Sequence, residues 1–136
     1  MVIYFAGSIR GGRSDQATYL HIIALLREYG RVLTEHIGDA GLSGTGEAAP
    51  DCEIHDRDLE WLRSADVLVA EVTTPSLGVG YEIGRAVEWG KRVVCLHRPT
   101  AGKRLSGMIA GCRGVTVYEY ADVNELPRVL GNVFER

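Results

Sequence analysis

Short runs rich in β-branched residues alternate with amphipathic runs along this chain, and that alternation constrains the fold more than any other feature. Strands are predicted over residues 2–6, 31–36, 66–72, 92–97 and 114–120. Helices are predicted over residues 14–30, 51–65 and 78–90, in a short helical turn over 105–110, and from Val123 onward. Strands and helices in alternation indicate an α/β fold, with a doubly wound, mainly parallel sheet of about five strands flanked by helices.

Size, charge and cysteine usage exclude several classes of protein. A chain of 136 residues is long enough for one domain, which we expect to span residues 1–136. A net charge of −3 offers no basic field for a nucleic acid polymer or an anionic membrane surface. The three cysteines are widely spaced, which suits free thiols in the cytosol and argues against a zinc site or disulfides. A nuclear location stays open in a eukaryote, although no basic run supports it.

Glycine-rich segments follow three of the predicted strands. They are "AGSIRGG" after the first, residues 38–50 after the second, and "VTTPSLGVG" after the third. In doubly wound sheets ligands bind at the carboxyl ends of the strands, so these segments are expected to surround a binding site. Residues 38–50 have no apolar period and are expected to form a loop that covers the site as a lid. The opening "MVIYFAGSIRGG" predicts a first strand and not a signal peptide.

Two acids lie on the apolar faces of two predicted helices. On a helical wheel Glu82 falls among the apolar residues of its helix, namely Val79, Ala86 and Trp89. Asp58 falls among those of the preceding helix, namely Ile54, Trp61, Leu62 and Ala65. Acids are seldom buried unless they are paired or have a function.

Each acid has a structural and a functional interpretation. Taken alone, either one could cap a neighbouring helix or pair with an arginine such as Arg10 or Arg85. Taken together, beside glycine-rich turns, Glu82 and Asp58 favour the cleavage of a glycosidic bond. That reaction needs one carboxylate at the anomeric centre and a second that handles protons or orients a hydroxyl.

The first and third glycine segments could each bind an anion. "GSIRGG" offers backbone N–H groups, the Ser8 hydroxyl and the Arg10 guanidinium before a helix start, and its spacing is neither a Walker loop nor GxGxxG. "PSLGVG" offers Ser76 and the amides of residues 77–80 before the helix that carries Glu82. The alternatives are a tight strand-to-helix turn for the first segment and a helix cap for the second.

The histidines and one tyrosine are less informative. His55 lies one helical turn before Asp58 and could pair with it, whereas His36 ends a strand near the expected cleft. His21 points away from the apolar face of its helix and is expected at the surface. Tyr4 either fills the core or presents its hydroxyl to the site, and strand alternation leaves both open.

Several longer motifs resemble those of one enzyme family. They are "YFAGSIRGGRSDQ", "VLTEHI", "IHDRDLEWLRSADVLVAEVTTPSLGVGYEIGRAV" and "LSGMI". They resemble the 2′-deoxynucleoside 5′-phosphate N-hydrolases (the Rcl family), which are relatives of the nucleoside 2-deoxyribosyltransferases. The resemblance implies a Rossmann-like homodimer that uses no metal or organic cofactor. It also implies hydrolysis of a deoxynucleoside 5′-monophosphate to free base and 2-deoxyribose 5-phosphate.

The same resemblance implies roles for individual residues. Glu82 matches the nucleophile, Asp58 the acid that assists at the sugar and leaving base, and Tyr4 the tyrosine that positions the nucleophile. The implied substrate-binding residues are Ser8, Ile9, Arg10, Gly11, His36, Ser76, Gly78 and Ser106. Within that set, His36 approaches the base, and Ser106 binds phosphate in the neighbouring site of the dimer.

Alternative functions stay open at this level. The chain ends in "VFER", without the terminal asparagine expected of a deoxyribosyltransferase, so hydrolysis is favoured over base exchange. A ribonucleotide N-glycosidase, acting for example on CMP, would differ by a contact to the 2′-oxygen. A sensor module that binds nucleotides without turnover would have no need for two buried acids beside an anion.

Overall fold

The computed structural model describes residues 1–8, 13–34, 49–100 and 102–135. Its centre is one parallel sheet of five strands in the order β2-β1-β3-β4-β5. The strands are β1 (Val2–Ala6), β2 (Arg31–Leu33), β3 (Val67–Glu71), β4 (Arg92–His97) and β5 (Val115–Glu119). The helices are α1 (Arg13–Leu26), α2 (Asp51–Ser64), α3 (Leu77–Glu88), α4 (Gly107–Ala110), the 3-10 turn η1 (Val123–Glu125) and α5 (Leu126–Phe134). The predicted α/β class and the parallel sheet are confirmed.

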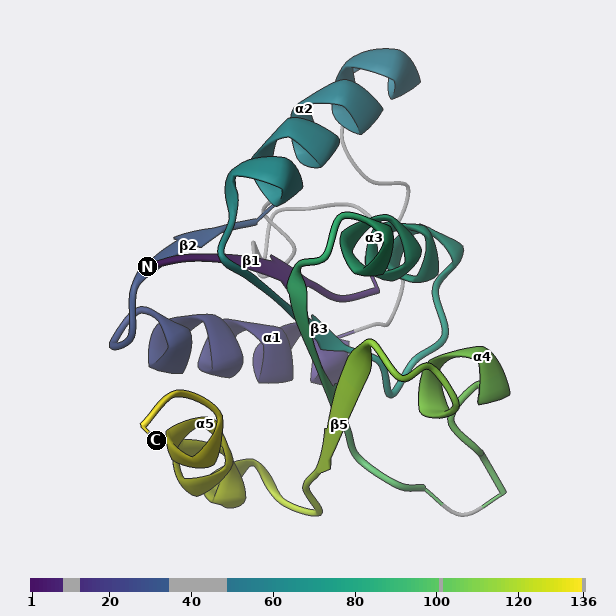
Figure 1. Ribbon diagram of the computed structural model, residues 1–136. Coiled ribbons are helices and arrows are strands. Elements are labelled where there is room, and N and C mark those ends of the chain that lie inside the picture. The colour runs from purple at the N-terminus through teal and green to yellow at the C-terminus, as the bar shows by residue number, and fades with distance from the viewer. Residues whose placement is uncertain (9–12, 35–48, 101, 136) are drawn as a thin grey trace.

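Helices cover both faces of the sheet (Figure 1). On one face α1 and α5 pack against Ile3 and Phe5 of β1 and the residues beside them. On the other face α2 and α3 pack against Tyr4 and Ala6. Successive side chains of a strand point to opposite faces, so β1 supplies both cores from alternate positions. All five residues of β3 are buried, as expected for a strand in the middle of a parallel sheet.

The first helix ends earlier than its apolar pattern predicts. The pattern extends to Gly30, but α1 ends at Leu26, and the amides of Glu28 and Tyr29 bond to carbonyls three residues back. Such bonds tighten the last turn of a helix. Gly30 is then required by contact, because a Cβ there would lie 2.4 Å from the carbonyl oxygen of Met1. Strand β2 is also shorter than predicted, and residues 35 and 36 of that prediction lie outside the described part.

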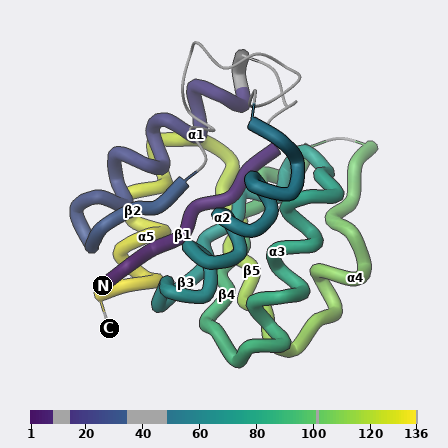
Figure 2. Tube along the Cα trace, turned by 90° about the horizontal axis from the view of Figure 1, so that it is seen from above, coloured from purple at the N-terminus to yellow at the C-terminus, as the bar shows by residue number. Residues whose placement is uncertain are grey.

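The chain adds strands on both sides of β1, so the winding of the sheet changes direction at that strand. The chain leaves β1 for β2 on one side and returns to β3 on the other, so the turns after β1 and β3 meet at one edge of the sheet. Figure 2 shows this from above, with β1 between β2 and β3 and with α2 and α3 over the strands. A doubly wound sheet binds its ligands at such a position.

Candidate active site

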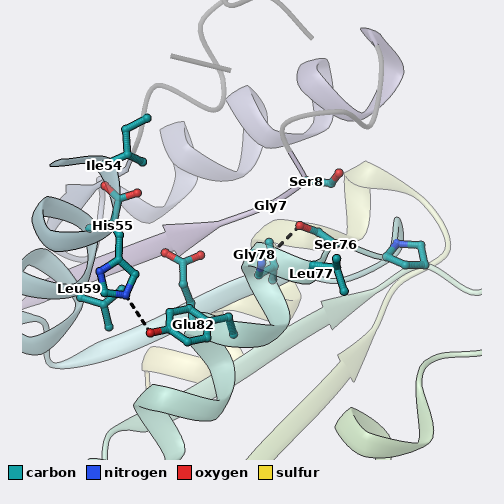
Figure 3. Close-up of a pocket in the computed structure, with 13 residues that line it drawn as sticks. Gly7, Ser8, Ile54, His55, Leu59, Ser76, Leu77, Gly78 and Glu82 are labelled. Atoms are coloured by element: carbon teal, nitrogen blue, oxygen red, sulfur yellow. Dashed lines mark hydrogen bonds between the residues drawn. The ribbon is translucent and has the colours of Figure 1, made fainter. Parts of the chain in front are cut away.

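An open cavity of about 490 Å³ lies at the carboxyl ends of β1 and β3. Its walls are the turn after β1 (Gly7 and Ser8), the inner side of α2, and residues 75–82, which form the turn after β3 and the start of α3. Figure 3 shows these segments around the cavity, with Glu82 between α2 and the turn that carries Ser76. Asp58 lines the same space. The two acids predicted to point inward therefore share one cavity.

Glu82 is held by β1, an inner strand of the sheet. Its side chain is buried on α3 beside Val79 and Ala86, which confirms the face predicted from the helical wheel. The hydroxyl of Tyr4 donates a hydrogen bond to Oε2 of Glu82. Tyr4 is itself buried in β1, which lies between β2 and β3, so this donor is attached to a strand inside the sheet. Both alternatives for Tyr4 hold in part, because its ring fills the core beneath α2 and α3 while its hydroxyl bonds to Glu82.

Asp58 is buried on α2 and is paired with its neighbour in sequence. Nε and Nη2 of Arg57 donate to Oδ1 of Asp58 over 3.0 and 2.9 Å. The structural alternative for the acids named Arg10 or Arg85, but the guanidinium on Asp58 is that of Arg57. Arg85 lies on α3 and donates instead to the hydroxyl of Tyr81 over 2.6 Å.

The expectation that His55 pairs with Asp58 is wrong. Nδ1 of His55 lies 2.9 Å from Oδ1 of Asp56, and its Nε2 lies 2.8 Å from the hydroxyl of Tyr81. The physical reason is direction: Asp58 points inward and is taken by Arg57, whereas the exposed His55 ring reaches across to α3. His55 still lines the cavity, together with Tyr81.

The turn after β3 is a helix cap with room beside it. Oγ of Ser76 accepts a hydrogen bond from the amide of Val79 over 3.3 Å, which confirms the cap that the sequence offered as one interpretation. Among the described residues, a Cβ on Gly78 would meet only Oγ of Ser76, at 3.9 Å, so packing against them does not require a glycine at this position. The first amides of a helix have no partner within it, so they are available to an anion.

The turn after β1 packs against Tyr19 of α1. A Cβ on Gly7 would lie 2.9–3.0 Å from three ring atoms of Tyr19, so the backbone there lies directly against that ring. The amide of Ser8 donates to the hydroxyl of Tyr19 over 3.1 Å, and Ser8 lines the cavity. The predicted site residues Ile9, Arg10, Gly11 and His36 lie outside the described residues, as do residues 38–48 of the predicted lid.

Ser106 lies apart from the other predicted site residues. Its Oγ caps the short helix α4 by accepting from the amide of Met108 over 3.3 Å. It lines a second pocket, of about 400 Å³, between α4 and the start of α3, and it does not line the first cavity. The surface at this second pocket is apolar, with Leu77 96% and Met108 84% exposed.

Two further buried acids were missed in the sequence. Glu71 is 2% and Asp15 8% exposed, and both lie close behind the cavity. An acid inside the apolar run "VLVAEV" was a usable signal for Glu71, whereas nothing in the sequence distinguished Asp15. Over the described residues, no group of three or more His, Cys, Asp or Glu side chains could hold a metal ion. Nor does any described helix have the length and apolar character needed to span a membrane.

Comparison with known proteins gives relatives over most of the chain. The sequence pattern of the family described as nucleoside 2-deoxyribosyltransferase matches residues 3–119. A 5-hydroxymethyl-dUMP N-hydrolase from Mus musculus is 56% identical over 98% of this chain and 79% of its own length. A protein of the same name from Danio rerio is 51% identical over 99% of this chain and 96% of its own.

Solved structures show the same architecture at lower identity. The CMP N-glycosidase BcmB from Clostridium botulinum superposes with a TM-score of 0.69 at 18% identity. The superposition covers 96% of this chain and 98% of that one. Likeness at this identity indicates a common fold.

Proposed function

This chain belongs to the nucleoside 2-deoxyribosyltransferase family, and we propose that it hydrolyses the N-glycosidic bond of 2′-deoxynucleoside 5′-monophosphates. The products are a free base and 2-deoxyribose 5-phosphate. Family membership agrees with the resemblance seen in the sequence motifs. The proposal rests most on one observation: a single cavity joins two buried carboxylates to the turn after β1 and the start of α3. Relatives at 56% and 51% identity that carry the name of an N-hydrolase support it.

In the proposed reaction Glu82 is the nucleophile. One of its carboxylate oxygens forms a bond to the anomeric carbon while the bond from that carbon to the base breaks. The base keeps the electron pair and receives a proton. Water then attacks the anomeric carbon, gives up a proton, and releases Glu82 as a carboxylate. The hydroxyl of Tyr4 supports this role because it fixes one oxygen of Glu82 from an inner strand.

Asp58 is the residue through which protons move. One proton reaches the leaving base through it, and another returns from the attacking water. Among the described residues, the hydrogen bonds to Asp58 come from Arg57 and go to Oδ1, and we assign Oδ2 to the substrate. The phosphate lies between Ser8 and the turn of Ser76 and Gly78, where backbone N–H groups and hydroxyls can bind its oxygens. The sequence resemblance also implies substrate-binding roles for Ile9, Arg10, Gly11 and His36, which lie outside the described residues.

A second copy of the chain completes the site in this proposal. Ser106 does not line the cavity of its own chain, and it borders the exposed apolar side chains of Leu77 and Met108. A homodimer through this surface would cover both side chains and carry Ser106 to the phosphate of the neighbouring site.

Mixing two inactive variants tests the shared site. A heterodimer of Ser106→Ala and Glu82→Gln would contain one site with both Glu82 and Ser106 intact. Random exchange would therefore restore about a quarter of the wild-type activity. If Ser106 acts within its own chain, mixing restores nothing. Sedimentation of the wild type as a monomer would also contradict the dimer.

The reaction itself is tested with a panel of substrates. Purified protein is incubated with deoxy- and ribonucleoside 5′-monophosphates and with the matching nucleosides, and released base is measured by chromatography. We expect release from the deoxynucleoside monophosphates and none from the nucleosides. Release from ribonucleotides such as CMP would shift the proposal to a ribonucleotide N-glycosidase, and binding without any release would indicate a sensor. The proposed location is the cytosol, which is supported by three free cysteines.

A further inference from the structure

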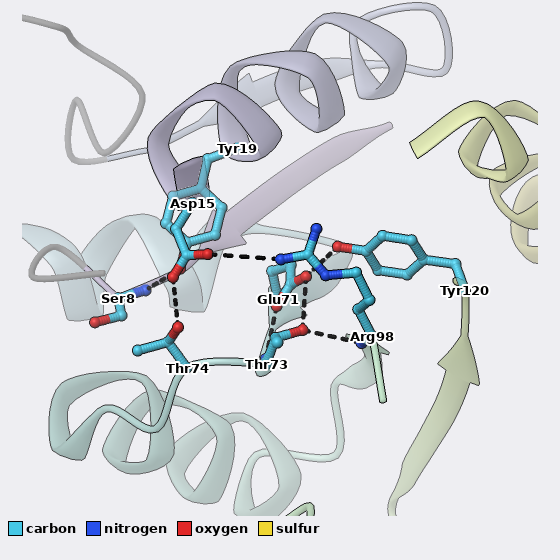
Figure 4. Close-up of polar contacts among 8 residues, drawn as sticks. All are labelled: Ser8, Asp15, Tyr19, Glu71, Thr73, Thr74, Arg98 and Tyr120. Atoms are coloured by element: carbon cyan, nitrogen blue, oxygen red, sulfur yellow. Dashed lines mark hydrogen bonds and ion pairs between the residues drawn. The ribbon is translucent and has the colours of Figure 1, made fainter. Parts of the chain in front are cut away.

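Two sets of bonded polar groups lie behind the cavity, on the side of α1: the pair Ser8–Tyr19, and a second set that contains Asp15 and Glu71 (Figure 4). Together they are called the turn network here, and its members are Ser8, Asp15, Tyr19, Glu71, Thr73, Thr74, Arg98 and Tyr120. Of these, only Ser8 lines the cavity. The other members are therefore placed to act on the turns and not on a ligand directly.

Helix α1 holds both turns of the cavity with one face. Tyr19 supports the turn after β1 through its ring against Gly7 and its hydroxyl, which accepts from the Ser8 amide. Asp15 holds the turn after β3, because its Oδ2 accepts a hydrogen bond from the hydroxyl of Thr74. Residues four apart on a helix lie on the same face, so one turn of α1 sets the distance between the two segments.

The carboxylate of Asp15 is paired with an arginine on the side away from the cavity. Oδ1 of Asp15 lies 3.8 Å from Nη2 of Arg98, and the backbone amide of Arg98 donates to Oγ1 of Thr73 over 2.9 Å. Burial, followed by the charge of Asp15, raises the pKa of Tyr19, so its hydroxyl stays protonated at neutral pH. Neither carboxylate of the turn network lines the cavity, so an anion bound there meets the held turns and not these acids.

We propose that Tyr19, Asp15 and Thr74 are positioning residues for the 5′-phosphate, which hold Ser8 and the start of α3 at the spacing that one phosphate group bridges. The inference rests on the proposed function only for the identity of the ligand. It predicts that disturbing either contact weakens the binding of a sugar phosphate and leaves the nucleoside part of the ligand unaffected. A phosphate bound at both turns loses one set of donors when the turns move apart, because hydrogen bonds weaken steeply with distance and angle.

The experiment compares Thr74→Val and Tyr19→Phe with the wild-type chain. Each change keeps the size of the side chain and removes one hydroxyl from the turn network. The dissociation constant of 2-deoxyribose 5-phosphate is measured by calorimetry, with inorganic phosphate as a second probe. We expect it to rise about tenfold in either variant, the loss that follows from one hydrogen bond to a charged group. Thr74→Ser keeps the hydroxyl and should bind within about twofold of the wild type.

Two matched controls separate positioning from general damage. Tyr29→Phe removes a hydroxyl from a ring that stacks on Phe134 in the α1–α5 layer, and Thr116→Val changes an exposed residue of β5. Both should bind the sugar phosphate as the wild type does. The melting temperature of every variant is also measured with and without inorganic phosphate at about 10 mM. A bound ligand raises the melting temperature, so a smaller rise in a variant indicates weaker binding.

The outcomes separate this inference from the proposed function. If Thr74→Val and Tyr19→Phe bind 2-deoxyribose 5-phosphate as the wild type does, the positioning role is wrong even when the wild type hydrolyses nucleotides. If the wild type hydrolyses no nucleotide but binds the sugar phosphate, and both variants weaken that binding, the proposed function fails and the positioning role stands. If the protein is active, the KM for the monophosphate should rise in both variants, while the inhibition constant of the free base stays unchanged. That result would further support the positioning role.

Discussion

Two pairs of buried carboxylates lie at the same edge of the sheet. Asp58 and Glu82, 4% and 8% exposed, line the cavity, whereas Asp15 and Glu71, 8% and 2% exposed, belong to the turn network behind it. Burial is nearly equal in the two pairs, so it does not separate a candidate catalytic acid from a structural one. The pairs differ in access to the cavity and in what their oxygens bind.

The oxygens of Glu71 are occupied by the chain itself. Oε1 accepts from the amide of Thr73 over 2.6 Å, and Oε2 accepts from the hydroxyls of Thr73 and Tyr120. These bonds tie the end of β3 to the residue after β5 and repay the cost of burying a carboxylate. Among the described residues, Asp58 in contrast accepts both of its hydrogen bonds on Oδ1, from Arg57. An acid whose oxygens all accept hydrogen bonds from the chain stabilises the fold, whereas an acid that lines a cavity is placed to act on a ligand.

The largest expected effect is that of Glu82→Gln. The amide keeps the shape of the side chain and an oxygen for the Tyr4 hydroxyl, but it is a poor nucleophile. We expect kcat to fall by at least about 10³-fold, with binding of a monophosphate changed by less than about threefold. Base release and calorimetry give the two values. If the variant keeps most of its activity, Glu82 is not the nucleophile.

The next effect is that of Asp58→Asn. The amide has no proton to exchange at working pH, so the steps assigned to Asp58 slow down. We expect kcat to fall by about 10²-fold, the lower end of the usual contribution of a general acid or base. Glu60→Gln is the matched control, because Glu60 is an exposed acid on the same helix. Equal rates for the two variants would contradict the role of Asp58.

Glu71→Gln should behave in the opposite way. The carboxylate accepts hydrogen bonds from Thr73 and Tyr120, and the NH₂ group of the new amide cannot accept them. At least one buried donor therefore loses its hydrogen bond. We expect the free energy of unfolding to fall by about 2 kcal/mol, while kcat falls far less than in Asp58→Asn. Urea unfolding and base release measure the two effects, with the exposed Glu88→Gln as control. A loss of turnover as large as that of Asp58→Asn, with stability unchanged, would break the comparison between the pairs.

The smallest effect is that of Tyr120→Phe, and it depends on pH. Removing this hydroxyl should cost about 1 kcal/mol of stability at neutral pH. Burial, followed by the hydrogen bond to Glu71, raises the pKa of Tyr120 above its ordinary value. The folded protein therefore keeps a proton that the unfolded chain loses above about pH 10, and stability falls as pH rises beyond that point.

The pH dependence gives a direct comparison of wild type and variant. Above about pH 10 the wild-type free energy of unfolding should fall by about 1.4 kcal/mol per pH unit more steeply than that of Tyr120→Phe. Below that pH the two curves should run parallel, with the wild type more stable. Urea unfolding at intervals from pH 8 to about 11 tests this. Parallel curves over the whole range would show that Tyr120 does not hold its proton in the fold.

Local periodicity explains which residues could be predicted. The helical period placed Glu82 and Asp58 on buried faces before any contact was known, and glycine and serine before α3 indicated the capped turn. Periodicity does not distinguish Glu71, because a strand in the middle of a parallel sheet is buried on both faces; the signal for Glu71 was its position inside an apolar run. Periodicity misplaced His55, whose partner depends on how α2 packs against α3.

The sequence by itself determined the alternation of strands and helices, the two inward acids and the two glycine turns, because each depends on neighbours within one or two helical turns. The tertiary structure decided the partners. Tyr4 and Glu82 are 78 residues apart, Asp15 and Thr74 are 59 apart, and Glu71 and Tyr120 are 49 apart. Contacts at such separations depend on strand order and on how helices pack on the sheet, so they form only when the whole fold is assembled.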